Sequence, residues 1–268
     1  MIADALARLI PMLGRAERGR HLWRADRPLV WAHRGVSAHA TENTLAAFAL
    51  AADHGADGVE FDVMGCASGE VVVCHDDDLG RLAGRWDRVE HLPWSTLRTI
   101  PLRGGGTVPL LTEALEATGS LLVNVELKSV HPGRPSPIPA AVAAILAERG
   151  VRDRVVVSSF DPVALWQFHL AAPTVPLGFL FELDVPAPWR AIGGLLGASS
   201  LHVQHDLCEP AAIAAWRARG FAVHAWTVDD PARLAALAAA GIDGVFANDP
   251  RAARTALATA TAASSSPS

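Results

Sequence analysis

Hydrophobic and polar positions follow two alternating patterns along residues 28–252. Short apolar runs rich in β-branched residues are separated by Ala- and Leu-rich stretches whose apolar positions recur at helical spacing. The short runs predict nine strands: Leu29–Ala32, Gly58–Val63, Val71–Cys74, Leu121–Leu127, Arg154–Ser159, Leu177–Phe181, Leu201–Val203, Phe221–Trp226 and Gly244–Phe246. The longer stretches predict helices at residues 43–54, 112–118, 138–149, 162–171, 209–219 and 231–240. Several of these stretches end at a glycine, as helices commonly do.

This alternation of strands and helices predicts the fold class. Repeated βα units imply a parallel sheet, because a parallel connection needs a crossover that a helix usually supplies. About eight units in roughly 220 residues favour a (β/α)8 TIM-type barrel over an open sheet. The composition shows no strong break, so we expect one α/β domain at residues 28–252.

The pattern departs from a regular barrel in two places. Nine strands compete for eight positions, so one is misassigned or lies outside the barrel. The segment between the second and third strands is too short for a parallel crossover, and it is expected to turn at Ser68-Gly69. After the third strand, residues 77–108 read as a small insertion or lid that contains Trp86 and Trp94.

The two ends of the chain differ from the barrel region. Residues 1–27 carry Leu6, Leu9, Ile10 and Leu13 at helical spacing, although Pro11 interrupts them. We expect a helix that plugs one end of the fold, and an amphipathic helix resting on a membrane is the alternative. Residues 253–268 end in a low-complexity sequence and are expected to form a flexible tail.

Composition and charge narrow the class of protein. The net charge is −5 and no run of basic residues is present, so we expect no nucleic-acid partner. The three cysteines, Cys66, Cys74 and Cys208, match no paired motif and are expected to be small buried residues. With neither a transmembrane segment nor a signal peptide in the sequence, we expect a cytoplasmic protein, and a homo-oligomer is left open.

Titratable residues gather at the carboxyl ends of four predicted strands. Residues two apart share one face of a strand, so Glu60 and Asp62 lie together and Glu126 lies on the corresponding face of its strand. His33 and His75 end two further strands. Any one of these residues would ordinarily be a rim or core residue. In a barrel, however, all of these strand ends converge on the mouth where active sites of this fold lie.

The chemistry of this set points to a cation and a phosphate. Three carboxylates that face one space require a positive partner, and an all-oxygen set suits Mg²⁺ or Ca²⁺. Arg34 and Lys128 add two cations beside the carboxylates, which favours an anionic, phosphate-like group. Two histidines with ordinary pKa values near neutrality could act as general acid and base. We therefore predict a metal-dependent phosphodiesterase centre.

These residues resemble those of the glycerophosphodiester phosphodiesterase family, within the phospholipase-C-like phosphodiesterases. The similarity covers about residues 29–250 through a series of motifs: WAHRG (31–35), TENTLAAF (41–48), GADGVEFDV (55–63), VVVCHDDDLGR (71–81), VPLLTEAL (108–115), VNVELK (123–128), VVSSFDP (156–162), HAWTVDD (224–230) and GIDGVFANDP (241–250). The chain departs from the usual pattern at Thr41, where proline is common, at residues 66–69, and at Asp229, where asparagine is common.

The resemblance implies a role for each site residue. Glu60, Asp62 and Glu126 would hold one Mg²⁺ or Ca²⁺, and His33 and His75 would be the acid/base pair, with the order left open. The residues implied to bind substrate or phosphate are Arg34, Lys128, Glu42, Asn43 and Trp226.

The resemblance also implies the reaction. The chain would hydrolyse glycerophosphodiesters to glycerol 3-phosphate and an alcohol, through a cyclic phosphate formed by the substrate's own 2-hydroxyl. A lysophospholipase-D-like enzyme acting on lipid glycerophosphodiesters is one alternative, favoured by Trp86, Trp94 and the N-terminal helix. A barrel that binds glycerophosphates without turnover is the other. His224 shares strand parity with Trp226 and is expected to face inward without an assigned role.

Overall fold

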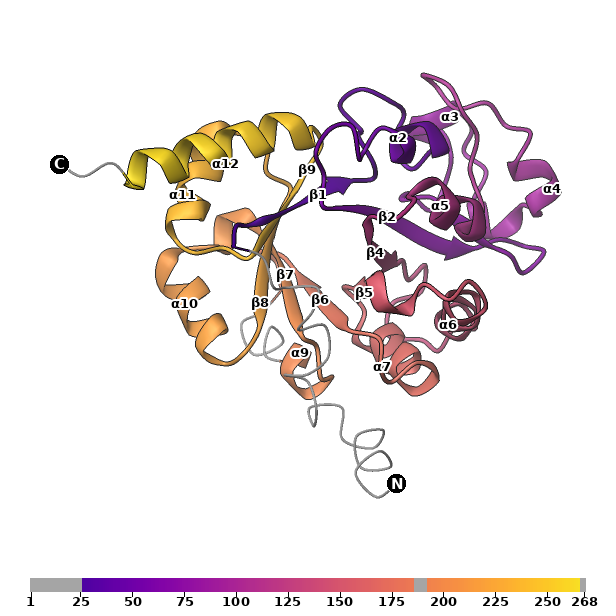
Figure 1. Ribbon diagram of the computed structural model, residues 1–268. Helices are drawn as coiled ribbons and strands as arrows, with labels where there is room; N and C mark the ends of the chain where they lie inside the picture. The colour runs from indigo at the N-terminus through magenta and orange to yellow at the C-terminus, as the bar shows by residue number, and fades with distance from the viewer. Residues whose placement is uncertain (1–25, 186–191, 266–268) are drawn as a thin grey trace.

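The computed structural model describes residues 26–185 and 192–265. Eight parallel strands close into a barrel in the order β1-β9-β8-β7-β6-β5-β4-β2, with β2 paired back to β1 (Figure 1). The barrel strands are β1 (Leu29–His33), β2 (Gly58–Gly65), β4 (Leu122–Leu127), β5 (Val155–Ser159), β6 (Leu177–Phe181), β7 (Ser200–Gln204), β8 (Ala222–Trp226) and β9 (Gly244–Ala247). The predicted (β/α)8 barrel is confirmed.

Helices surround the barrel (Figure 1). They are α2 (Leu45–Ala49), α5 (Leu111–Ala117), α6 (Ile138–Glu148), α7 (Pro162–Ala171), α9 (Ile192–Leu195), α10 (Pro210–Ala218), α11 (Pro231–Ala239) and α12 (Pro250–Ser265). Several begin at a proline, and in α7 and α11 the preceding Asp161 and Asp230 accept the first free backbone amides. The predicted helix at 43–54 is shorter than expected, because the chain beyond Ala49 continues in turns.

Alternating side chains divide each barrel strand between two environments. On β2, Val59, Phe61 and Val63 join the main core between the strands and the helices, while Glu60 and Asp62 belong to the opposite face. Inside the barrel, Trp31 packs with a small cluster of apolar residues below the polar mouth. Gly58 leaves room for this indole, because a Cβ there would lie 2.4 Å from the Trp31 ring.

The third predicted strand, β3 (Val71–Val73), is not a barrel strand. It pairs antiparallel with β2 at the edge of the sheet, with Val63 opposite Val73. The expectation that His75 ends a barrel strand is therefore wrong. The tight turn at Ser68-Gly69 forces the chain to run back along β2, and the amide of Cys74 donates to the carbonyl of Asp62 at 3.0 Å. His75 thus returns to the same mouth by an antiparallel route.

The segment after β3 has its own small core. It contains α3 (Gly80–Ala83), the 3₁₀ turn η1 (Val89–His91) and α4 (Trp94–Leu97). Its apolar residues pack with the outer face of β3 and the end of β2, and the buried members are Met64, Cys66, Val72, Cys74, Leu79, Leu82, Val89, Leu97, Ile100, Leu102 and Val108. The predicted small insertion after the third strand is confirmed as a compact unit at one side of the barrel.

Most of the segment expected to be a flexible tail is helical. Residues 250–265 form α12, and Ala253 and Leu257 bury apolar surface against the barrel. Arg254 donates to the carbonyl of Pro28 at 3.2 Å and so ties α12 to the start of β1. The predicted N-terminal helix falls in residues 1–25, outside the described residues.

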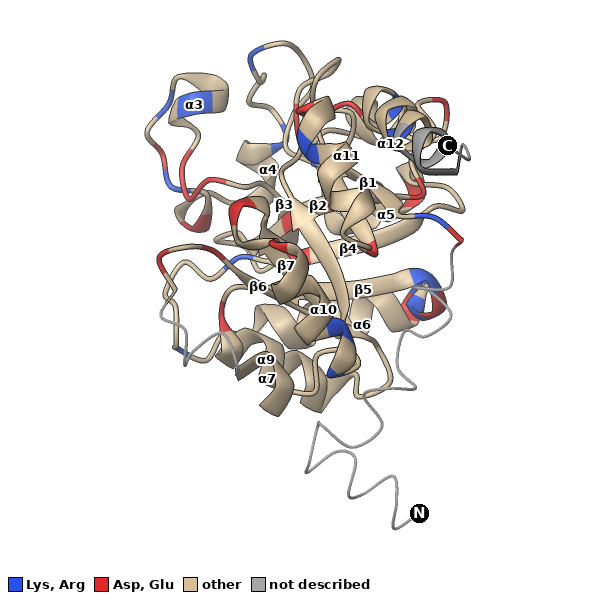
Figure 2. Ribbon diagram, turned by 90° about the vertical axis from the view of Figure 1, so that its left-hand side faces the viewer, with Lys and Arg blue, Asp and Glu red and all other residues tan. Residues whose placement is uncertain are grey.

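Charged side chains and free thiols occupy different parts of the fold. Lys, Arg, Asp and Glu lie mainly in loops and on helices, and both signs occur around α3 (Figure 2). Cys66, Cys74 and Cys208 are buried free thiols, as predicted. Among the described residues, no helix combines the length and the apolar character needed to cross a bilayer.

Candidate active site

A cavity of about 450 Å³ opens at the carboxyl ends of the barrel strands. Most of the predicted site residues reach it from the ends of β1, β2, β4 and β8, and His75 reaches it after β3. Its lining consists of His33, Arg34, Glu60, His75, Asn124, Glu126, Lys128, Phe160, Leu180, Glu182, Val185, Trp226 and Phe246. One wall is charged and the other is apolar.

The His-Arg-Gly turn after β1 aims backbone and side chain at the carboxylates. Arg34 has a left-handed backbone (φ 56°), which directs its amide to Oε2 of Glu60 at 2.9 Å. Gly35 follows with φ 81°, and a Cβ there would lie 2.7 Å from Ala47, so no larger residue fits. A non-glycine residue in this conformation is uncommon and is often found at functional sites.

The three predicted metal carboxylates lie together and are buried. Glu60, Asp62 and Glu126 each offer an oxygen, and these oxygens all lie within 4.8 Å of one another. Burial, reinforced by the charge of Asp62, raises the pKa of Glu60 well above its usual range. Burial also raises the pKa of Glu126 to about 7, although Lys128 opposes the shift. For Asp62 the effect of burial is outweighed by Lys128, His75 and Arg34, which lower its pKa.

This triad is chemically suited to a divalent cation. Its donors are oxygens alone, the set that Mg²⁺ and Ca²⁺ prefer. The raised pKa values of Glu60 and Glu126 express the cost of burying three carboxylates together, and a cation would offset that cost. In the structure Lys128 offsets part of it, with Nζ 2.9 Å from Oε1 of Glu126 and 3.7 Å from Oδ1 of Asp62.

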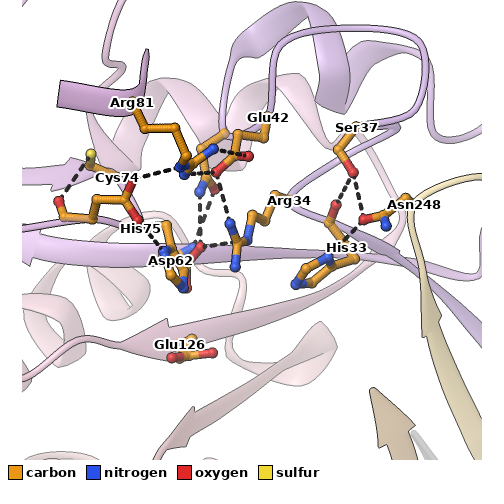
Figure 3. Close-up of polar contacts among 12 residues, drawn as sticks. His33, Arg34, Ser37, Glu42, Asp62, Cys74, His75, Arg81, Glu126 and Asn248 are labelled. Atoms are coloured by element: carbon orange, nitrogen blue, oxygen red, sulfur yellow. Dashed lines mark hydrogen bonds and ion pairs between the residues drawn. The ribbon is translucent and has the colours of Figure 1, made fainter. Parts of the chain in front are cut away.

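His33 is held by a short chain of polar groups. Its Nδ1 lies 2.9 Å from Oδ1 of Asn248, the residue that directly follows β9. The amide nitrogen of Asn248 donates to Oδ2 of Asp229 at 2.5 Å, and its backbone amide donates to Oδ1 of Asp229 at 2.8 Å. Ser37 also contacts Oδ1 of Asn248, at 2.9 Å (Figure 3). Asn248 therefore presents its oxygen to His33, so Nδ1 carries the proton and Nε2 has the free lone pair.

His75 belongs to a different network, in which charges alternate. Its Nδ1 lies 2.7 Å from Oδ1 of Asp76, whose other oxygen accepts from Arg81 at 2.7 Å. Arg81 also donates two bonds of 2.7 Å to Glu42, and Glu42 accepts from Arg34 at 2.8 Å. Figure 3 shows this run from Arg81 through Glu42 to Arg34. Burial opposes ionisation of Asp76, but Arg81 and His75 lower its pKa, so the carboxylate stays charged.

The second wall of the cavity is apolar. Phe160 and Trp226 meet edge to face with ring centroids 5.6 Å apart, and Leu180, Val185 and Phe246 continue the surface. Glu182 is the acidic residue among the described residues on this side. His224 points into the barrel as predicted, fully buried, and its Nδ1 accepts from the indole of Trp31 at 2.9 Å. It lies among the residues below the cavity.

The structure therefore brings the predicted residues to one place, while the roles assigned to them stay predictions. Glu42, Asn43 and Asp62 do not line the cavity itself, but each contacts a residue that does. Glu42 and Asn43 are hydrogen-bonded to Arg34, and Oδ1 of Asp62 lies 3.7 Å from Nζ of Lys128. Asn248 and Asp76 were missed, although both follow a strand end and one is next to a predicted histidine. Arg81 gives no such signal in the sequence, because it reaches Glu42 only when the insertion folds back over the mouth.

One known protein family matches most of this chain. The model of the family described as the glycerophosphoryl diester phosphodiesterase family matches residues 33–252. The chain belongs to this family. The matched range begins at His33 and includes every predicted site residue.

Relatives and solved structures agree with the family. The glycerophosphodiester phosphodiesterase of Caldanaerobacter subterraneus subsp. tengcongensis is 31% identical over 234 residues, which cover 83% of this chain and 94% of the relative. That of Bacillus altitudinis is 29% identical, covering 82% and 94%. An Oleispira antarctica phosphodiesterase, solved with its product sn-glycerol-3-phosphate, is 29% identical with a TM-score of 0.78, covering 87% and 97%. The predicted enzyme class, a phosphodiesterase of glycerophosphodiesters, is thereby confirmed.

Proposed function

We propose that this enzyme hydrolyses glycerophosphodiesters to glycerol 3-phosphate and an alcohol, with one Mg²⁺ or Ca²⁺ and two histidines. The observation that carries the proposal is the cavity that joins a buried carboxylate triad, two cationic side chains and two histidines held by different partners. The product bound to the Oleispira antarctica phosphodiesterase supports the choice of substrate.

The charged wall would bind the phosphodiester. Glu60, Asp62 and Glu126 would hold the cation, which supplies positive charge to the phosphoryl oxygens when it is bound. Arg34 and Lys128 lie beside these carboxylates and would bind the remaining phosphoryl oxygens. Glu42 fixes the guanidinium of Arg34 at 2.8 Å, so Arg34 meets the phosphate in a set orientation.

His33 is the better candidate for the general base. Asn248 keeps the proton on Nδ1, which leaves the lone pair of Nε2 for the cavity. Burial, with the charge of Arg34, lowers the pKa of His33, so the neutral form prevails at neutral pH. Its Nε2 would take the proton of the substrate's 2-hydroxyl while that oxygen attacks phosphorus.

His75 is the better candidate for the general acid. The ionised carboxylate of Asp76 accepts a hydrogen bond from its Nδ1 at 2.7 Å, which orients the ring and leaves Nε2 for proton transfer. Protonated His75 would give its proton to the departing alcohol as the bond from phosphorus to that oxygen breaks, which leaves a cyclic phosphate. The histidines then exchange roles: His75 takes a proton from water as the water attacks phosphorus, and His33 gives its proton to the 2-oxygen as the bond from phosphorus to that oxygen breaks.

The apolar wall leaves a lipid substrate as a second candidate. Phe160, Leu180 and Trp226 would accommodate an acyl chain as well as a small alcohol. The expected lid residues do not support this candidate, because Trp94 lines a separate groove and Trp86 is 81% exposed. Turnover of glycerophosphocholine and of lysophosphatidylcholine should be compared directly. Activity on the lipid alone would replace the first candidate with the second.

Single substitutions test the catalytic proposal against a barrel that only binds. With glycerophosphocholine and excess Mg²⁺, we expect His33→Ala and Glu126→Ala to lose at least about 10²-fold in kcat/KM. Release of glycerol 3-phosphate by the unsubstituted enzyme is the positive control. Binding of glycerol 3-phosphate without any turnover would instead support the non-catalytic barrel.

A further inference from the structure

A second group of metal-binding side chains lies outside the active site. His39 comes from the loop after β1, His54 from the turns after α2, and Asp249 from the junction of β9 and α12. Each offers one donor atom, and these donors all lie within 4.8 Å of one another. None of the three side chains lines the active-site cavity.

We propose that His39, His54 and Asp249 bind a divalent transition-metal ion of the Zn²⁺ class. Two imidazole nitrogens and one carboxylate select borderline ions such as Zn²⁺ and Co²⁺, whereas Mg²⁺ and Ca²⁺ prefer oxygens alone. Three protein ligands also match the number found in open zinc sites, where water completes the coordination. The carboxylate triad would thus bind Mg²⁺ or Ca²⁺, and this second site would bind an ion of the Zn²⁺ class.

The distances already approach those of a bound ion. Nε2 of His39 lies 3.1 Å from Oδ2 of Asp249, and Nδ1 of His54 lies 3.8 Å from Oδ1 of the same carboxylate. Metal bonds of about 2.0–2.1 Å at tetrahedral angles place neighbouring ligand atoms about 3.3 Å apart. Small rotations of the two rings, whose centroids are 5.1 Å apart, would therefore complete the site.

Backbone contacts hold Asp249 and the loop that carries His39 in place before any ion binds. Oδ1 of Asp249 accepts from the amides of Arg251 at 3.1 Å and Ala252 at 3.2 Å, which fixes the carboxylate at the start of α12. The loop carrying His39 is joined to the same junction, because the amide of Ala38 donates to the carbonyl of Asn248 at 3.1 Å. A site that is ordered in advance loses less entropy when its ligand binds.

Two further observations point to a cation. Nδ1 of His54 is buried and has no hydrogen-bond partner within the part of the chain that the structure describes. Such a nitrogen is costly unless it finds a ligand. In addition, Asp249 lines a surface groove whose charged residues, Glu42, Asp229 and Asp249, are all acidic. An acidic groove raises the local concentration of cations at this position.

An ion bound here would link segments that follow the first and last barrel strands. β1 and β9 are neighbouring strands, and His39 and Asp249 lie in the segments that follow them. An ion shared by these two residues and His54 would tie the loop after β1 and the turns after α2 to the start of α12. We therefore expect the bound ion to raise thermal stability, since a ligand that binds the folded state stabilises it.

The test counts Zn²⁺ by equilibrium dialysis of untagged, chelator-stripped protein in excess Mg²⁺, which occupies the oxygen triad. We expect one Zn²⁺ per chain and a higher unfolding temperature with Zn²⁺ present. His39→Ala and His54→Ala should each lose the ion and the stabilisation. The side chain of His39 is 49% exposed, so His39→Ala should keep the fold intact. This variant therefore still tests the site if His54→Ala fails to fold.

A second two-histidine grouping supplies the matched control. His91 and His131 each lie 3.7 Å from Glu90, but their side chains are 70% and 63% exposed, and the three donor atoms do not all lie within 4.8 Å of one another. His91→Ala should keep one Zn²⁺. The proposal fails if the unsubstituted protein binds none, if both His39→Ala and His54→Ala keep it, or if His91→Ala loses it.

Discussion

The side-chain amide of Asn43 donates to Oδ2 of Asp62 at 2.8 Å, and both residues are buried. Asn43 has a left-handed backbone (φ 56°), and its own amide donates to the carbonyl of Arg34 at 2.9 Å. The turn after β1 and the carboxylates on β2 are thereby locked together. Asn43 thus orients one of the three carboxylates, a contact of the kind that sets metal affinity in proteins.

Replacing Asn43 with glycine should weaken the binding of the cation. Glycine keeps the left-handed backbone, so Asn43→Gly removes the amide without backbone strain. We expect the Mg²⁺ concentration for half-maximal activity to rise about 10–100-fold, with a smaller change in the activity at saturating Mg²⁺. Titration of activity with Mg²⁺ measures both quantities. An unchanged Mg²⁺ requirement would show that Asp62 is placed without Asn43.

The nature of the leaving group should separate the two histidines. His75→Ala should lose about 10²–10⁴-fold in kcat on glycerophosphocholine, because the departing choline needs a proton. The same variant should lose far less on a nitrophenyl diester of glycerol phosphate, since nitrophenol leaves readily as an anion. His33→Ala should lose activity on both substrates. Equal losses of His75→Ala on both substrates would contradict its role as the acid.

Strand parity explains why much of the site could be predicted from the sequence. Glu60 and Asp62 are two apart on β2, and Glu126 is paired with Asp62 on the neighbouring β4. Such residues must share a face in any parallel sheet, so periodicity alone brings them together. His33 follows from the same rule. His75 was placed correctly at the mouth for the wrong reason, because the rule assumed a barrel strand where the chain forms an antiparallel one.

The partners that set protonation could not be predicted in this way. The hydrogen bond from His33 to Asn248 joins the ends of the first and last barrel strands, over 200 residues apart, and Asp229 reaches the pair from a third loop. The contact of Arg81 with Glu42 depends on the path of the insertion. Such contacts depend on tertiary packing of loops, which have no periodic pattern.

Exchanging two side chains should shift the pH dependence in a known direction. Burial and Arg34 lower the pKa of His33. In the unsubstituted enzyme, the midpoint of the acid limb of the kcat/KM profile should therefore lie below pH 6.5. The double variant Asp229→Asn with Asn248→Asp keeps the net charge but places a carboxylate against Nδ1 of His33. A carboxylate favours the imidazolium, which raises the pKa by about 1 unit or more.

The acid limb of the double variant should therefore move to higher pH. A base with a raised pKa loses its neutral form sooner as pH falls, so activity at about pH 6 drops relative to about pH 8. The single variant Asp229→Asn keeps the neutral amide of Asn248 beside His33 and should keep the limb in place. Profiles of kcat/KM against pH measure both. If the acid limb of the double variant does not move, the group whose pKa sets this limb is not His33.

Removing one buried carboxylate should change the stability of the metal-free enzyme. Burial raises the pKa of Glu126 to about 7, well above the ordinary value that applies in the unfolded chain. Between about pH 4.5 and 7 the folded state therefore binds more protons at this position, so the free energy of unfolding decreases as pH rises. Glu126→Gln cannot ionise, and in chelator its unfolding temperature should fall less steeply across this range.

The same variant should respond weakly to Mg²⁺, because a neutral amide replaces a charged ligand. Thermal unfolding from about pH 4.5 to pH 8, with chelator and with Mg²⁺, measures both effects. Glu148→Gln on the exposed face of α6 is the control, and it should match the unsubstituted enzyme in both conditions. If Glu126→Gln keeps the full pH slope and the full Mg²⁺ stabilisation, the carboxylate of Glu126 takes no part in the cation site.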